Sequence, residues 1–213
     1  MRVDMWSDIV CPFCWLGRQR LEAAARAERI ELRLTWGSFE LDPRRPKLGA
    51  PGLVAHIAKK YGMSVEQSLG AQQQLAQAFA QYGGVYDFER ARPANTFDAH
   101  RLSHLAATRG LSDRMQARLM RAYFAEGEAI SDHATLRRLA EEAGLKPDEI
   151  EATLTSDAFA DDVRRDEEIA TQQLDVQGVP FFVLEGRLAI SGAQPVETFR
   201  GALRQMADQI AKT

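Results

Sequence analysis

The sequence predicts an α/β fold that is interrupted by a large all-helical insertion. Strand patterns lie near both ends of the 213-residue chain, and helical patterns fill the stretch between them. The α/β domain is therefore expected to be discontinuous, with residues 1–45 and 160–213 on either side of a helical domain of residues 46–159. A chain of this length is sufficient for one domain with a large insertion.

The first part of the chain has the pattern of a β-α-β unit. The apolar run Arg2–Ser7 is typical of a buried strand, and Pro12–Glu28 follows it as a helix. In Ile30–Trp36, apolar side chains alternate with polar ones, which is the two-residue period of a strand. Pro12 suits the first helical turn because no hydrogen bond is lost there.

Helical patterns follow one another beyond the Pro/Gly-rich stretch of residues 41–52. Polar residues at helix starts act as caps, because their side-chain oxygens accept from free backbone N–H groups. Three such caps are predicted: Ser64 with Gln67, Asn95 with Asp98, and Asp132.

The last part of the chain predicts a hairpin and a closing helix. Residues 179–184 and 187–190 form the two strands, and the pair Glu185-Gly186 forms the turn between them. Beyond Pro195, apolar residues recur at steps of three and four, as on the buried face of a helix. A proline at the beginning of a central strand favours a special backbone geometry, so we expect a cis Val179–Pro180 bond.

The composition indicates an ordinary soluble enzyme, with 45% hydrophobic residues and a net charge of -3. Basic residues are scattered along the chain, so nucleic acid is not an expected partner. No apolar run approaches the length of a membrane span, and the N-terminus has no apolar stretch typical of a secretory signal. We therefore expect a cytoplasmic protein with no membrane partner, and the oligomeric state stays open.

The tetrapeptide Cys11-Pro12-Phe13-Cys14 is the most informative motif of the chain. Two cysteines three positions apart on the first turn of a helix can close a small disulfide, and the free N–H groups of that turn stabilise a thiolate. Because the chain has only these two cysteines, a structural disulfide framework is excluded. The motif predicts a redox centre in which Cys11 attacks and Cys14 resolves.

A metal site is the alternative use of such a motif. A tetrahedral zinc ion would require two further ligands. His100 and His104 stand four positions apart on a predicted helix and face the same way, but no third and fourth ligand is evident beside them. We therefore expect neither a metal nor a tightly bound cofactor.

The chain resembles the DsbA-like branch of the thioredoxin superfamily. The CxxC motif after the first strand, the helical insertion and the late Gly178-Val179-Pro180 together carry this resemblance, which spans the whole chain. The segments WSDIVCPFCWLG, NTFDAH and GVPFFV are similar to those of FrnE-type cytoplasmic members, which are often labelled as 2-hydroxychromene-2-carboxylate isomerase or DsbA-like proteins. The resemblance implies a thioredoxin-like fold for the α/β domain.

The resemblance also implies roles for single residues. Cys11 corresponds to the exposed nucleophile, Cys14 to the buried resolving thiol and Pro180 to the cis-proline that faces them. The backbone of Val179 would pair with an extended substrate peptide by strand addition. Pro12, inside the motif, is expected to contribute to the same substrate-binding surface.

Phe13 and Asp4 are the two remaining candidate site residues. Phe13 is expected to contact substrate, and it occupies the position at which strongly oxidising relatives carry His. Since Phe13 cannot donate a comparable hydrogen bond to a thiolate, we expect a less oxidising disulfide. Thioredoxin relatives often place an acid beneath the cysteine pair, so Asp4 is a candidate proton acceptor for Cys14. The alternative for Asp4 is a strand-end residue that faces solvent.

The leading functional prediction is a protein thiol–disulfide oxidoreductase of the reductase, isomerase or oxidase type. Its partners would be protein or peptide thiols and disulfides, with glutathione as a candidate co-substrate. The alternative is a glutathione-dependent isomerase or transferase that resembles 2-hydroxychromene-2-carboxylate isomerase and the kappa-class transferases. Those relatives use a serine at the position of Cys11, which counts against this alternative. A third prediction is a peptide-binding or chaperone-like protein.

Overall fold

The computed structural model describes residues 1–45 and 52–212, and the chain divides into two compact units. One unit consists of Met1–Leu41 and Val163–Thr213, and the other of Asp42–Asp162. The expected domain boundary after residue 45 borders residues 46–51 of the Pro/Gly-rich stretch, which lie outside the described residues.

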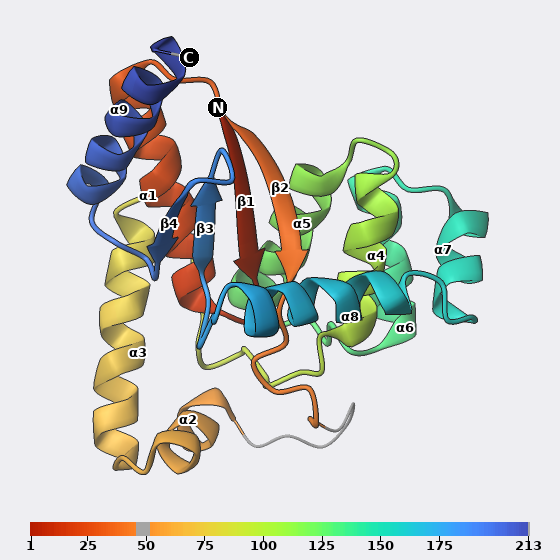
Figure 1. The fold of residues 1–213 in the computed structure, drawn as a ribbon. Coiled ribbons are helices and arrows are strands. Elements are labelled where there is room, and N and C mark those ends of the chain that lie inside the picture. The colour runs from red at the N-terminus through yellow and green to blue at the C-terminus, as the bar shows by residue number, and fades with distance from the viewer. Residues whose placement is uncertain (46–51, 213) are drawn as a thin grey trace. The chain divides into compact units, whose positions relative to one another are not determined.

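The first unit is built on a four-stranded mixed sheet with the strand order β2-β1-β3-β4 (Figure 1). Strand β1 (Arg2–Ser7) runs parallel to β2 (Arg33–Ser38) and antiparallel to β3 (Phe181–Leu184). Strand β4 (Leu188–Ser191) completes the predicted hairpin with β3. The turn pair between them, Glu185-Gly186, has two positive φ angles, 49° and 67°, and the N–H of Arg187 donates to the carbonyl of Leu184 across it at 2.9 Å.

Each face of this sheet is covered by helical segments. Helices α1 (Pro12–Glu28) and α9 (Val196–Ala211) lie side by side on one face (Figure 1). On that face Phe199 packs edge-on against Phe182, with ring centroids 5.1 Å apart. Helix α8 (Ala160–Glu168) and the short π-helical segment η2 (Ile169–Gln173) cover the other face, where Trp6 forms a buried cluster with Ala170 and Val176.

The second strand begins three residues later than the sequence predicts. Arg29, in the left-handed conformation, ends α1, and the N–H of Ile30 still donates to a carbonyl of that helix, Ala25 O, at 2.9 Å. Pairing with β1 starts at Arg33, which lies opposite Arg2. The predicted strand Ile30–Trp36 is therefore wrong at both ends: Ile30 completes the helix end, and the strand continues to Ser38.

The second unit is helical, as predicted. In the described residues its elements are α2 (Leu53–Tyr61), α3 (Val65–Ala80), α4 (Phe97–Ala107), α5 (Ser112–Arg121), the π-helical segment η1 (Ala122–Glu126), α6 (His133–Ala143) and α7 (Pro147–Leu154). Three aromatic rings form one part of its core: Phe79 stacks on Tyr86 with centroids 5.0 Å apart, and Phe124 packs edge-on against both. No helix in the described part of the chain is both long and apolar enough to span a membrane.

Two of the three predicted caps are confirmed in full, and the third is confirmed in part. Ser64 and Gln67 form a reciprocal capping box at α3, and the carboxylate of Asp132 accepts from the N–H of Thr135 at 2.8 Å. At α4 the Oδ1 of Asn95 accepts from the N–H of Phe97, the first residue of the helix, at 3.2 Å, so Asn95 caps this helix start as predicted, although Thr96 stands between them. The carboxylate of Asp98 instead belongs to a buried ion pair with Arg101.

A buried ion pair joins three helices of the second unit. Arg101 is 4% exposed and donates to Asp98 Oδ1 at 2.9 Å. The other carboxylate oxygen of Asp98 lies 2.8 Å from Nε2 of His133, the first residue of α6. The guanidinium also donates to carbonyls in and beyond the last turn of α7, namely those of Thr153, Ser156 and Ala158. Charge-assisted bonds at this depth fix the helices relative to one another.

Candidate active site

Cys11 and Cys14 lie on the first turn of α1, directly beyond the end of β1. The chain turns at Asp8, whose carbonyl accepts from the N–H of Cys11 at 3.1 Å. Cys11 precedes the helix in an extended conformation, with φ -88° and ψ 109°, and its carbonyl accepts from the N–H of Cys14 at 3.1 Å. Pro12 occupies the first helical position, as predicted. In the described structure no side chain caps this helix end, so its dipole is free to favour an anion.

Cys14 is completely buried, and its environment keeps it protonated. Burial raises the pKa of the Cys14 thiol well above its ordinary value. Hydrogen bonding to the Cys11 side chain and the charges of Cys11 and Asp8 raise this pKa further, while a backbone hydrogen bond with Asp8 acts in the opposite direction. At neutral pH, Cys14 is therefore a poor nucleophile until a neighbouring group takes its proton.

Cys11 is more covered than the sequence predicts. The resemblance implies an exposed nucleophile, but only 3% of the surface of Cys11 is exposed. The loop before β3 contributes to this cover, because the carbonyl oxygen of Val179 lies 3.5 Å from Sγ of Cys11 and accepts from its thiol. The cysteine at the start of α1 and the loop before β3 thus meet, although 168 positions separate them in the sequence.

The Val179–Pro180 bond is cis, and Pro180 is buried. The carbonyl of Pro180 accepts from the N–H of Gly192 at 2.8 Å, which ties this loop to the end of β4. Strand β3 begins only at Phe181, since Pro180 has no N–H and Val179 points its carbonyl at Cys11. The predicted strand start at residue 179 is thus two residues too early.

Among the four residues of the motif, Phe13 is the one most open to solvent. Its side chain is 51% exposed, whereas both cysteines are buried and Pro12 is half-buried. The structure therefore places an exposed apolar side chain beside the covered Cys11. Such a side chain suits contact with an apolar part of a substrate.

Asp4 does not lie beneath the cysteines, contrary to what the resemblance implies. Successive side chains of a strand point to opposite faces, and Met5 lies opposite Phe182 on the face that α1 covers. Asp4 therefore belongs to the other face, where it pairs with Arg2 at 3.4 Å and is 25% exposed in its side chain. This correction follows from the two-residue period of β1.

The carboxylate that acts on Cys14 belongs to Asp8. Asp8 is 1% exposed, and its Oδ2 accepts from the N–H of Leu41 at 2.8 Å, at the end of the first unit's N-terminal segment. Its negative charge contributes to the raised pKa of Cys14. From the sequence, Asp8 is interpreted as a turn residue, with a role in shaping the helix entry as the alternative. Its position three residues before Cys11, just past the end of a buried strand, is the signal that could have indicated a buried role.

The two histidines considered as metal ligands lie on α4 in the helical unit. His100 is buried with 1% of its surface exposed, and His104 is half-buried. Within the described residues, no group of three or more His, Cys, Asp or Glu side chains has the geometry to hold a metal ion.

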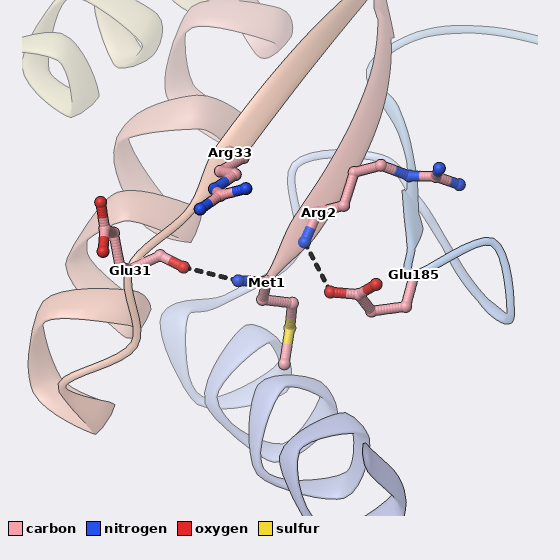
Figure 2. A pocket seen from close by; sticks show the side chains of 5 residues that line it. All are labelled: Met1, Arg2, Glu31, Arg33 and Glu185. Atoms are coloured by element: carbon pink, nitrogen blue, oxygen red, sulfur yellow. Dashed lines mark hydrogen bonds between the residues drawn. The ribbon is translucent and has the colours of Figure 1, made fainter. Parts of the chain in front are cut away.

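A separate pocket lies at the opposite end of β1, away from the cysteines. It has a volume of about 270 Å³ and is lined by Met1, Arg2, Glu31, Arg33 and Glu185 (Figure 2). Its lining groups are largely engaged with each other: Met1 N donates to Glu31 O at 2.8 Å, and Arg2 N donates to Glu185 Oε1 at 2.6 Å. No residue in this lining is a nucleophile, so we do not place chemistry there.

A mixed sheet, a CxxC motif at the start of its first helix and a cis-proline facing the motif define a thioredoxin-like protein. The chain belongs to the family of the DSBA-like thioredoxin domain, whose model matches residues 2–204. The predicted fold and the predicted DsbA-like membership are thereby confirmed. Membership indicates oxidoreductase or isomerase chemistry on thiols and disulfides.

Three solved structures illustrate this relationship. A probable DsbA oxidoreductase from Streptomyces coelicolor is 41% identical, with a TM-score of 0.91 over 96% of this chain and 89% of that one. 2-Hydroxychromene-2-carboxylate isomerase is 20% identical, with a TM-score of 0.74 over 100% and 98%. The cytosolic disulfide reductase DsbM from Pseudomonas aeruginosa, also solved with glutathione, is 21% identical, with a TM-score of 0.66 over 98% and 100%. The last two similarities show the fold alone.

Proposed function

We propose that this protein is a thiol–disulfide oxidoreductase that works through Cys11 and Cys14. One observation carries the proposal: the two cysteines share the first turn of α1, and the Val179 carbonyl before the cis-proline lies 3.5 Å from the Cys11 sulfur. A structural disulfide or a packing role would not require a helix start and a proline loop to converge on one sulfur atom.

In the reductive direction, the Cys11 thiolate attacks one sulfur of a substrate disulfide. The new S–S bond joins Cys11 to the substrate, and the other substrate sulfur leaves as a thiolate that takes up a proton. Cys14 then loses its proton and attacks the Cys11 sulfur, which releases the second substrate thiol and leaves a Cys11–Cys14 disulfide. Two electrons have moved to the substrate, and the oxidase direction is the reverse of these steps.

The raised pKa of Cys14 gives the two cysteines different roles in this scheme. Because burial keeps Cys14 protonated, it does not compete with Cys11 for the substrate. Cys14 becomes reactive only when the mixed disulfide places an electrophilic sulfur beside it. This order of events makes Cys11 the attacking and Cys14 the resolving residue.

We propose protein or peptide disulfides as the substrates. The exposed ring of Phe13 offers an apolar contact beside Cys11, with Pro12 as its neighbour. Val179 and Pro180 form the other side of the site, where the backbone of Val179 can pair with an extended peptide. Cys11 is covered in the free protein, so a substrate has to displace the Val179 carbonyl from the thiol before the attack.

Glutathione is the co-substrate that we propose for restoring the dithiol. Two glutathione molecules would reduce the Cys11–Cys14 disulfide through a mixed disulfide and leave as oxidised glutathione. The fold shared with DsbM, which has been solved with glutathione, supports this choice. A cytoplasmic location would suit such a cycle, because the glutathione pool there is reducing.

A glutathione-dependent isomerase or transferase is the second candidate. The fold shared with 2-hydroxychromene-2-carboxylate isomerase favours it. Cys11 is the observation against it, since a CxxC pair beside bound glutathione would exchange disulfides with it, whereas a hydroxyl would not.

The reduction potential of the Cys11–Cys14 couple tests the proposal. The protein is equilibrated in glutathione buffers, quenched and analysed by mass, so that dithiol, disulfide and glutathione adduct are separated. We expect a reversible intramolecular disulfide in wild type and a trapped mixed disulfide in Cys14→Ser. If wild type forms no such disulfide and binds glutathione non-covalently, the isomerase or transferase is correct and the oxidoreductase is wrong.

A further inference from the structure

Helix α1 approaches the cis-proline loop most closely at Gly17. Gly17 is buried on the helix face that carries Cys14, three positions earlier. A Cβ atom at Gly17 would lie 2.9 Å from Cγ of Pro180 and 3.1 Å from Cζ of Phe182. Real side chains do not approach this closely, so the Pro180 ring occupies a notch that exists only because residue 17 has no side chain.

The neighbours of this notch have little freedom to move. Pro180 is a ring in the backbone and cannot change rotamer, and its carbonyl is already bonded to the N–H of Gly192 at 2.8 Å. Phe182 is fully buried and packs against Phe199. A side chain at position 17 would therefore push α1 and the proline loop apart, because the alternative is to compress a packed core.

The separation of α1 from the proline loop also sets the geometry at Cys11. Cys11 is the residue that starts α1, and the Val179 carbonyl that covers it is bonded directly to Pro180. The two contacts, Gly17 with Pro180 and Cys11 with Val179, join the same two segments about 1.7 helical turns apart. A shift at the first contact is transmitted to the second.

We infer that Gly17 is a positioning residue for the active site: the notch at Gly17 seats the Pro180 ring and thereby holds the Val179 carbonyl against the Cys11 thiol. Gly17 touches neither substrate nor sulfur and acts through Pro180. The inference deepens the proposed function, since it rests on Cys11 and Val179 forming the peptide-binding site.

The test compares Gly17→Ala with Gly201→Ala. Gly201 lies in α9 of the same unit, and a Cβ there would meet no heavy atom of the described residues within 4 Å. Two quantities are measured. The first is the rate at which iodoacetamide alkylates Cys11, with the modified residue located by peptide mass. The second is the rate of reaction with a disulfide-linked peptide divided by the rate with bis(2-hydroxyethyl) disulfide. The second quantity is a ratio, so a loss of folded protein does not change it.

For Gly17→Ala we expect Cys11 to be alkylated several-fold faster, because the Val179 carbonyl no longer covers it. We expect the ratio of peptide to small-disulfide rates to fall by about tenfold or more, since the small reagent does not use the Val179 backbone. Gly201→Ala is expected to match wild type in both quantities. If Gly17→Ala also matches wild type in both, the inference is overturned and Gly17 serves helix packing alone.

A second variant keeps the test decisive if Gly17→Ala does not fold. Gly17→Ala combined with Phe182→Leu removes the ring atom at 3.1 Å but retains the Pro180 contact at 2.9 Å, and it is compared with Phe182→Leu alone. Failure of the proposed function has a different signature. Wild type would then react with neither disulfide, and the alkylation rate of Cys11 would still show whether Gly17 positions the loop.

Discussion

Phe13 has the most exposed side chain of the CxxC motif, and it carries no hydrogen-bond donor for a neighbouring sulfur. The potential of a thiol pair depends on how well the reduced form is stabilised. We predict that Phe13→His makes the disulfide more oxidising, because a protonated imidazole can donate to the Cys11 thiolate. A gain of one donor worth about 1.4 kcal/mol corresponds to about 30 mV.

The matched control for this prediction is Phe13→Leu, which keeps an apolar side chain and is expected to leave the potential near that of wild type. Both potentials are measured in glutathione buffers at pH 7. A potential for Phe13→His that is equal to or lower than that of wild type would contradict the argument.

Asp8 and Asp4 offer a second test at the scale of single residues. The charge of Asp8 contributes to the raised pKa of Cys14, whereas Asp4 lies on the opposite face of the sheet. We predict that Asp8→Asn lowers the pKa of Cys14 and that Asp4→Asn leaves it unchanged. In Asp8→Asn the new amide oxygen can still accept from the N–H of Leu41, so the variant removes mainly the charge.

The titration of Cys14 is followed by thiolate absorbance in a Cys11→Ser background. A lower pKa in Asp4→Asn would return the buried carboxylate role to Asp4, and an unchanged pKa in Asp8→Asn would contradict the part assigned to Asp8.

The sequence is sufficient to predict that Cys11, Cys14 and Pro180 come together, but not how they are covered or that Asp8, and not Asp4, acts on Cys14. Cys11, Cys14 and Pro180 follow from local signals: a CxxC motif after a strand and a proline at a strand start. The exposure of Cys11 depends on the Val179 loop, which is 168 positions away, and no local pattern reports it. The role expected for Asp4 depends on the face of the strand to which its side chain points, and presence in the strand does not decide that face.

At the scale of helices, Asp98 and Arg101 form a buried ion pair within the insertion. The Arg101 guanidinium bonds both to α4 and to the carbonyls at the end of α7. We predict that Arg101→Ala lowers the free energy of unfolding by about 3–5 kcal/mol, because it leaves the Asp98 carboxylate buried without its guanidinium.

The control is Arg109→Ala, which removes an exposed pair with Glu149 and is expected to change stability far less. Urea unfolding at pH 7 measures both variants. Equal losses for the two would show that burial of the Asp98–Arg101 pair is not what stabilises the helices.

Element types were predictable, whereas several element ends were not. Strand β1 and helix α1 have the predicted bounds because apolar periodicity and Pro12 define them locally. Strand β2 starts late because the end of α1 uses Ile30, and β3 starts late because Pro180 has no N–H to pair. Asn95 accepts from the N–H of Phe97 as a cap does, whereas its predicted partner Asp98 pairs with Arg101 one turn later. The error at β2 arises because a neighbouring element uses the same backbone group, which the local pattern does not show.

At the scale of the whole molecule, the buried Cys14 thiol makes the stability of the reduced protein depend on pH. In the unfolded chain its thiol has an ordinary pKa of about 8.5, and in the folded reduced protein burial raises this pKa. At a pH between those two pKa values, the Cys14 thiol is deprotonated in the unfolded chain and still protonated in the folded protein. The contribution of the protonated Cys14 to the free energy of unfolding is therefore complete below about pH 8.5. It is lost as the pH rises toward the pKa of Cys14 in the folded state.

We predict that the reduced protein loses stability above about pH 8.5, with a slope of at most about 1.4 kcal/mol per pH unit from this group. Cys14→Ser retains Cys11 and lacks the buried thiol, so its unfolding free energy should not show this component. Urea unfolding of both proteins from pH 7 to about pH 10.5 under reducing conditions gives the difference. Parallel curves across this range would mean that Cys14 ionises in the folded protein as it does in the unfolded chain. In that case burial would not separate the roles of the two cysteines, and the order of attack would have to come from the position of the substrate alone.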